Sequence, residues 1–222
     1  MAGTITALVV QQRDKQRVNV HLDGAFSFGL ALSEAAHLRK GQFLSDEEIE
    51  ALKARDTVER AYEHALRFLA YRPRSAEEVR RNLRDHNADP GVIDAVLERL
   101  ERAGLVNDAE FARFWVENRQ QFRPRSPQAL RYELRQKGVP PEVINAALAT
   151  LDDETLAYDA ARTRLNRLRH ADPDVFRRKL SDFLSRQGFS YPLVREVVEN
   201  LLAEHEATRG DATQGMEDTD NA

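Results

Sequence analysis

The sequence predicts a mainly α-helical protein: an elongated tandem array of three three-helix repeats, helix-turn-helix-like in form, preceded by a small three-stranded antiparallel β-meander. Two observations predict this fold class. Near the N-terminus, apolar and polar residues alternate with a period of two, which is typical of half-buried strands. From about residue 57 the apolar residues follow a helical period, and the helical pattern recurs at an offset of 51 and then 50 residues.

The three strands are expected within the first thirty residues. Ile5 to Gln11 is rich in β-branched residues, and residues 17–22 alternate basic or polar with apolar side chains. Asp23-Gly24 follows, the pair favoured in tight hairpin turns because both turn positions need a positive φ. Residues 25–28 continue with a period of two. These segments together predict the β-meander.

Helices are expected from there to about residue 204. A short one is predicted over about 33–39, and Ser45 with Glu48 forms a capping box that opens another. The predicted units are residues 1–56 (β-meander and short helices), 57–106 (repeat 1), 107–151 (repeat 2), 152–206 (repeat 3) and 207–222 (a disordered acidic tail).

Internal similarity identifies the repeats. Tyr71-Arg-Pro-Arg-Ser75 and Phe122-Arg-Pro-Arg-Ser126 match closely at an offset of 51. Each repeat should contain a first helix, a short second helix and a third helix with one apolar stripe. The second helices are expected to open at Ser75, Ser126 and Asp172 as N-caps. The residues expected to turn after them, in a left-handed conformation, are Asn87, Gly138 and Gly188.

Composition narrows the class of protein. The chain has 222 residues, 41% hydrophobic and 32% charged, as expected of a chain that can build apolar cores. No run of eighteen apolar residues occurs, so a membrane span is not expected. The start lacks the features of a secretory signal, and there is no cysteine. A cytoplasmic protein without disulfides fits these features.

The net charge of −4 conceals an uneven distribution. Residues 119–137 carry six basic residues against one acidic, and residues 162–195 carry nine against three. Residues 196–222 carry eight acidic residues against one arginine. The basic segments are therefore separated from much of the acidic charge, which favours a role in binding an anionic partner.

No enzyme motif is present. The ten glycines never form a phosphate-binding loop, and the six histidines show no metal-ligand spacing. Carboxylates lie three or four residues from arginines on helix faces, the pattern of solvated surface pairs. We therefore expect no catalytic residues, no metal and no cofactor. A hydrolase with an unrecognised site is the weakest alternative, and it predicts turnover of a nucleotide or nucleic acid.

The candidate binding residues are arginines and lysines of the repeats. The Arg-Pro-Arg segments lie at helix N-termini, where backbone N–H groups already favour anions. They could bind a DNA phosphate or an acidic side chain of a partner, or they could pair with carboxylates of the chain itself. The third helices offer acidic and apolar residues, so base readout is not expected. The candidates are Arg72, Arg74, Arg119, Arg123, Arg125, Arg131, Arg135, Lys137, Arg177, Arg178 and Lys179.

Three ordered motifs carry a resemblance to a known family. They are Arg72-Pro-Arg-Ser-Ala-Glu-Glu-Val, Gly104-Leu-Val-Asn-Asp-Ala-Glu-Phe-Ala, and Glu133-Leu-Arg-Gln-Lys-Gly-Val. The chain resembles the RecX regulators of bacterial RecA recombinase over about residues 57–205, and part of that family also has a β-rich N-terminal extension. Repeat 3 departs from the pattern, because Arg169-His-Ala-Asp-Pro stands where the others have aromatic-Arg-Pro-Arg-Ser.

The resemblance implies a non-enzymatic regulator of homologous recombination, DNA repair and the SOS response. Such a protein binds the RecA–DNA filament and inhibits recombinase, coprotease and ATPase activity. The implied partners are the RecA filament and single- or double-stranded DNA, with no membrane, and a monomer is expected. The alternative is a direct, non-sequence-specific DNA-binding protein that uses the same basic stripe.

Overall fold

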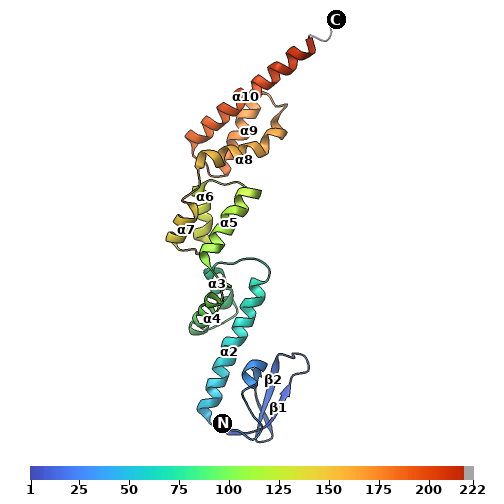
Figure 1. The fold of residues 1–222 in the computed structure, drawn as a ribbon, viewed down its shortest axis with the longest axis vertical. Helices are drawn as coiled ribbons and strands as arrows, with labels where there is room; N and C mark the ends of the chain where they lie inside the picture. Colours follow the sequence, from blue (N-terminus) through green and yellow to red (C-terminus); the bar gives the residue numbers. More distant parts are fainter. Residues whose placement is uncertain (218–222) are drawn as a thin grey trace. The chain divides into compact units, whose positions relative to one another are not determined.

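The computed structural model describes the backbone of residues 1–217 and the side chains of residues 1–207 (Figure 1). The chain divides into two compact units, Met1–Asn107 and a second that begins at Asp108. The first holds an antiparallel sheet and repeat 1, and the second holds repeats 2 and 3. The predicted class, mainly helical with three three-helix repeats after an N-terminal sheet, is confirmed. No helix of the described part is long and apolar enough to cross a membrane.

The sheet has four strands, so the prediction of three is wrong by one. Their order is β3-β2-β1-β4, and all neighbours are antiparallel. The additional strand, β4, is two residues long, too short to show an alternating pattern. It forms because the edge of β1 offers free backbone groups: Ile5 N–H donates to Gln42 O, and Gly41 N–H donates to Ile5 O, both at 2.8 Å. The strands are β1 (Gly3–Val10), β2 (Arg17–Leu22), β3 (Ala25–Ala31) and β4 (Phe43–Leu44).

The predicted alternation and hairpin are confirmed. Val18, Val20 and Leu22 are buried on β2, while the residues between them are only partly covered. Asp23 and Gly24 have φ values of 49° and 87°, as the tight turn requires. The following helix, α1 (Leu32–Ala35), is shorter than the predicted 33–39.

A single long helix, α2 (Asp46–Leu69), crosses the predicted boundary at residue 56. Ser45 and Glu48 form the predicted capping box at its start. Its first half covers the sheet and its second half is the first helix of repeat 1, so the sheet and repeat 1 are one unit (Figure 1). Sequence analysis separates them because charged residues continue through the middle of this helix.

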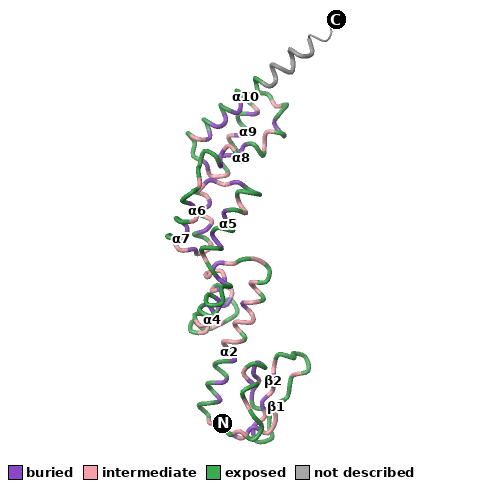
Figure 2. The backbone as a smooth tube through the Cα atoms, viewed as in Figure 1, coloured by how far each residue is buried: buried purple, intermediate pink, exposed green. Residues whose placement is uncertain are grey.

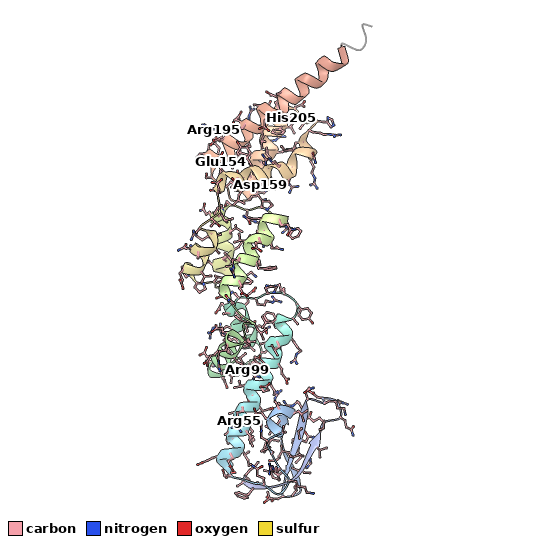
Figure 3. All side chains as sticks on the ribbon, in the orientation of Figure 1. Arg55, Arg99, Glu154, Asp159, Arg195 and His205 are labelled. Carbon is pink, nitrogen blue, oxygen red and sulfur yellow. The ribbon has the colours of Figure 1, made fainter. Side chains whose placement is uncertain are left out.

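Asp56, in the middle of α2, holds the sheet against the helix. It is buried, with 6% of its surface exposed. Arg17 on β2 donates to both of its oxygens at 3.2 and 2.9 Å, and the Ala31 N–H donates at 2.7 Å. Arg55, also on α2 (labelled in Figure 3), adds a pair with Glu34, with its Nε 2.9 Å from Glu34 Oε2. One carboxylate therefore joins two strands and a helix.

Repeat 1 is completed by α3 (Ala76–Asp85) and α4 (Pro90–Arg102). Ser75 accepts a hydrogen bond from the Glu78 N–H at 3.1 Å, which confirms it as an N-cap. The buried stripe of each helix faces a small common core (Figure 2). Apolar residues at helical spacing in α3 and α4 fill this core and are all buried: Val79, Leu83, Ile93, Leu97 and Leu100.

Repeats 2 and 3 repeat this arrangement, each around its own core. Ser126 caps the second helix of repeat 2 through a hydrogen bond from the Ala129 N–H at 3.1 Å. Asp172 occupies the corresponding N-cap position in repeat 3 but makes no side-chain capping bond. The helices are α5 (Asp108–Phe122), α6 (Pro127–Gln136), α7 (Pro141–Leu148), α8 (Asp153–Leu168), α9 (Pro173–Arg186) and α10 (Tyr191–Glu217).

The residue after each second helix is left-handed, as predicted. Asn87, Gly138 and Gly188 have φ values of 59°, 74° and 91°. Gly188 also joins repeats 2 and 3, because Ser126 Oγ–H donates to its carbonyl at 2.7 Å. The Ser126 N–H donates to the Gln187 carbonyl at 3.1 Å. The end of α9 is thus hydrogen-bonded to the start of α6.

The C-terminal segment differs from the sequence-based expectation. Disorder is predicted from residue 207, but α10 continues to Glu217. A helix that is already formed gains one backbone hydrogen bond with each added residue, so polar residues can continue it without an apolar stripe. Residues 218–222, the rest of the predicted tail, lie outside the described part of the chain.

Candidate binding surface

The Arg-Pro-Arg segment of repeat 1 is largely engaged within the chain. Arg72 forms a two-pronged pair with Glu78, with Nη2 to Oε1 at 2.9 Å and Nη1 to Oε2 at 3.1 Å. The Arg74 guanidinium lies over the Phe68 ring, 4.0 Å from its centroid. Burial, followed by the charge of Arg72, lowers the pKa of Arg74. Sequence analysis left open whether these arginines bind a partner or pair with carboxylates of the chain itself. Arg72 pairs with a carboxylate of the chain.

In repeat 2 a single carboxylate, Glu133, gathers three donors. The Trp115 indole N–H donates to its Oε2 at 2.8 Å, and Arg119 Nε–H donates to the same oxygen at 2.7 Å. Arg125 Nε lies 3.2 Å from the other oxygen, as an ion pair without hydrogen-bond geometry. Arg119 also lies over the Trp115 ring, 4.3 Å from its centroid, and Lys137 Nζ is 5.1 Å from it. Arg119 and Lys137 therefore lie against one indole, and Arg119 and Arg125 share the carboxylate to which that indole is hydrogen-bonded.

The other candidates of repeat 2 differ in whether they have a partner within the chain. Arg123 and Arg135 are exposed, and no carboxylate of the described residues pairs with them. Arg131 donates to Asn145 on α7. The first arginine of the segment is thus available in repeat 2, whereas its counterpart Arg72 in repeat 1 is paired.

In repeat 3 the candidates lie on α9. Arg177 pairs with Glu199 at 2.9 Å and with Asp174 at 3.3 Å. Hydrogen bonding to Glu199 raises the pKa of Arg177. Arg178 and Lys179 are exposed. Of this basic run, the last two residues are the ones open to a partner.

Equivalent positions of the three repeats carry different contacts between the first and second helices. In repeat 1, His64 Nε2 lies 2.9 Å from Asn82 Oδ1. At an offset of 51 residues the same positions hold Trp115 and Glu133. In repeat 3 the position equivalent to Glu133 is Phe183, and the Arg164 guanidinium lies over its ring at 4.4 Å. The repeats therefore share a backbone and a core but differ in this polar contact.

The contact in repeat 1 predicts a pH dependence. Burial, followed by the charge of His86, lowers the pKa of His64 below its ordinary 6.5. The folded protein therefore binds fewer protons here than the unfolded chain, and stability present above about pH 6.5 is lost as the pH falls through the folded pKa. We expect the urea midpoint of the first unit to fall on acidification, and to fall less in His64→Gln.

The measurement is urea unfolding followed by far-ultraviolet circular dichroism at about pH 7.5 and about pH 5.5. His37→Gln is the matched control, because His37 is exposed in the same unit. If His64→Gln and His37→Gln changed the pH dependence of the urea midpoint equally, the dependence could not be assigned to His64.

Sequence reasoning missed three residues that lie beside the candidates. Phe122, Arg164 and Arg167 line one cleft together with Arg123 and Arg125. The spacing of Arg164 and Arg167, three residues apart on a helix, was an available signal, because it places both on one face. The described residues contain no cluster of three or more side chains that could hold a metal ion.

The sheet and the three repeats each match a known family of domains. Models of four family domains match the chain: the regulatory protein RecX N-terminal domain at residues 3–45, and the first, second and third RecX three-helix domains at 61–100, 107–148 and 152–198. These matches fall in the same order as the sheet and the three repeats.

Curated relatives and a solved structure agree. The protein named Regulatory protein RecX from Geobacillus kaustophilus (strain HTA426) is 32% identical, over 88% of this chain and 76% of that one. Its namesake from Amycolatopsis mediterranei (strain U-32) is 38% identical, over 70% of this chain and 91% of that one. A crystal structure of regulatory protein RecX has a TM-score of 0.70 and 26% identity, covering 89% of this chain and 99% of that one. The chain described here therefore belongs to the RecX family of regulatory proteins.

Proposed function

We propose that this protein inhibits RecA by binding along the RecA–DNA filament, without chemistry of its own. It would thereby reduce the recombinase, coprotease and ATPase activities and modulate DNA repair and the SOS response. The observation that carries the proposal is the ordered match of the sheet and all three repeats to the RecX domains. Repeated units suit a polymeric target, because several weak contacts made at once multiply through effective concentration.

The contacts within the chain divide the candidate residues into three groups. Three of them contact a ring or an amide of the chain: Arg74, Arg131 and Lys137. Arg72, Arg119, Arg125 and Arg177 are paired with the chain's own carboxylates. We propose that the exposed candidates make the first contact with the filament: Arg123, Arg135, Arg178 and Lys179.

The test is ATP hydrolysis by RecA on single-stranded DNA, with the protein added. Arg123→Glu/Arg135→Glu should raise the concentration needed for half-inhibition by about tenfold or more, because two exposed attractive charges become repulsive. Both side chains are exposed, so helical content should stay unchanged by circular dichroism. Reversal at Arg125 is less informative, since it would also break the pair with Glu133.

The matched control is Arg84→Glu/Arg102→Glu, which makes the same charge change at exposed positions of repeat 1. It should inhibit like the unmodified protein. If both double variants weakened inhibition equally, the effect would come from the change in net charge and not from these positions. If Arg123→Glu/Arg135→Glu inhibited as well as the unmodified protein, these two residues would not belong to the binding surface.

Direct, non-sequence-specific DNA binding is the second candidate function. It is favoured by the exposed arginines and lysines on α6 and α9 and by the net positive charge of residues 119–137 and 162–195. A protein that binds phosphates loses affinity steeply as salt rises. Titration of naked DNA at several salt concentrations, without RecA, therefore separates the two functions.

A further inference from the structure

Repeats 2 and 3 enclose a cationic cleft of ≈ 450 Å³. Its walls come from the Arg-Pro-Arg loop that follows α5, from α8 and from the end of α9. No carboxylate lines it. The residues that give it its character are Phe122, Arg123, Arg125, Arg164, Arg167 and Phe183. Four guanidiniums thus meet without an acid among the lining residues.

Two of these guanidiniums have an N–H group that makes no hydrogen bond among the described residues. The Nε atoms of Arg125 and Arg164 are buried and have no hydrogen-bond partner among the described residues. Arg164 is held by its stacking on Phe183 and not by an acid. A buried N–H without an acceptor costs free energy. An anion that enters this cleft would supply charge and an acceptor to Arg164 Nε, whereas Arg125 Nε already has the Glu133 carboxylate at 3.2 Å.

A second cleft of ≈ 390 Å³ adjoins the first. Arg164, Arg167 and Phe183 line both. Lys179 and Arg186 line the second cleft but not the first, and they add two cations against one carboxylate, Asp182. The cations therefore continue past the shared wall, as successive phosphates of a chain would require, whereas a single small anion would need only one cluster.

Phe122 points to the nature of the ligand. It lines the first cleft and is nevertheless 68% exposed, although it lies among arginines. An exposed aromatic ring beside cations can stack an unpaired base. The bases of a duplex are already stacked on one another and are not free to stack on this ring. An acidic peptide would use the arginines but not the ring.

We propose that this cleft binds a single-stranded nucleic acid, with phosphates on Arg123, Arg164 and Arg167 and a base stacked on Phe122. Arg125 supports the site from its pair with Glu133. The proposal deepens the DNA-binding candidate above and does not depend on RecA inhibition. It adds Phe122, Arg164 and Arg167 to the residues suggested by the sequence.

The test is fluorescence anisotropy of a labelled oligothymidine of about 20 nucleotides, titrated with the full chain at several salt concentrations. Arg167→Glu should weaken binding by about tenfold or more, since a charge-assisted contact becomes repulsive. It should also reduce the slope of log K against log salt by about 0.7, the value for one phosphate of a single strand. Phe122→Ala should weaken binding by about fivefold or more with an unchanged slope.

Arg162→Glu is the matched control, because Arg162 lies on the same helix, α8, is exposed and does not line the cleft. It should weaken binding by less than about threefold. Arg167→Gln guards against a folding defect, and Trp115 fluorescence, from the only tryptophan, should match in every variant.

Three results would overturn the proposal. Equal losses in Arg167→Glu and Arg162→Glu would show binding by net charge alone. Tighter binding of a duplex of the same sequence would exclude a single-strand site. Competition by polyglutamate as strong as by unlabelled oligothymidine would assign the cleft to acidic peptides. Failure here with intact inhibition of RecA would leave the proposed function standing, and the converse result would leave the cleft standing.

Discussion

Asp56→Ala is expected to lower the free energy of unfolding of the first unit by about 3–5 kcal/mol. The substitution removes the acceptor of three hydrogen bonds, two from Arg17 and one from the Ala31 N–H. It leaves a largely buried guanidinium and a buried amide without partners. Such groups destabilise the folded state, because they have lost the hydrogen bonds that water gives them in the unfolded chain. Urea unfolding followed by circular dichroism measures the change, and Asp56→Asn, which keeps an acceptor, should lose less.

Asp94→Ala is the control for Asp56. Asp94 also pairs with an arginine, Arg80, at 2.6 Å, but its side chain is 66% exposed. Exposed pairs of this kind contribute about 0–1 kcal/mol. If the two alanine variants were equally stable, the burial of Asp56 would not be what makes its contacts important.

Gly188→Ala is expected to destabilise the second unit by about 2–4 kcal/mol. Gly188 has a φ of 91°, which strains any residue with a Cβ. A Cβ there would also lie 2.9 Å from both Ala129 Cβ and Ser126 Oγ. The backbone of α9 would have to move away from α6 and stretch the Ser126–Gly188 hydrogen bond. Chemical unfolding followed by Trp115 fluorescence reports this unit directly.

Two variants separate the steric clash from the backbone strain. Gly104 also has a positive φ, 67°, but a Cβ added at this position would meet no atom within 4 Å. Gly104→Ala should therefore cost only about 1–2 kcal/mol. Ala129→Gly should cost less stability in the Gly188→Ala background than it does alone, since there it removes one of the clashing atoms and so recovers part of the loss. A cost at Gly188 no larger than at Gly104, or no recovery, contradicts a tight junction between repeats 2 and 3.

The repeats could be predicted because their signals are local. The helical spacing of apolar residues predicted one buried stripe in the third helix, which the burial of Ile93, Leu97 and Leu100 confirms. The residue types at Asn87, Gly138 and Gly188 identified left-handed turns. Such features depend on a few neighbouring residues and recur at each repeat, so each copy supports the interpretation of the others.

One missed feature, the burial of Asp56, depends on residues far apart in the chain. Asp56 lies among charged residues that read as a solvated helix face, and its burial follows from Arg17 and Ala31 on the sheet. The basic residues were found by composition. Arg72 and Arg123 occupy equivalent places, but Arg72 pairs with Glu78, six residues further on, and the corresponding position of repeat 2 is Ala129, so this difference was present in the sequence and was overlooked.

The differing contacts at equivalent positions bear on how the chain avoids misassembly. Similar repeats in one polypeptide can exchange helices during folding, because each helix fits the backbone of its neighbours. If α5 docked on α9, Trp115 and Arg119 would face Phe183 in place of Glu133 and lose their acceptor. If α2 docked there, His64 would lose Asn82. Exchange of helices between repeats would therefore leave polar groups without partners. This cost favours the packing of each helix within its own repeat.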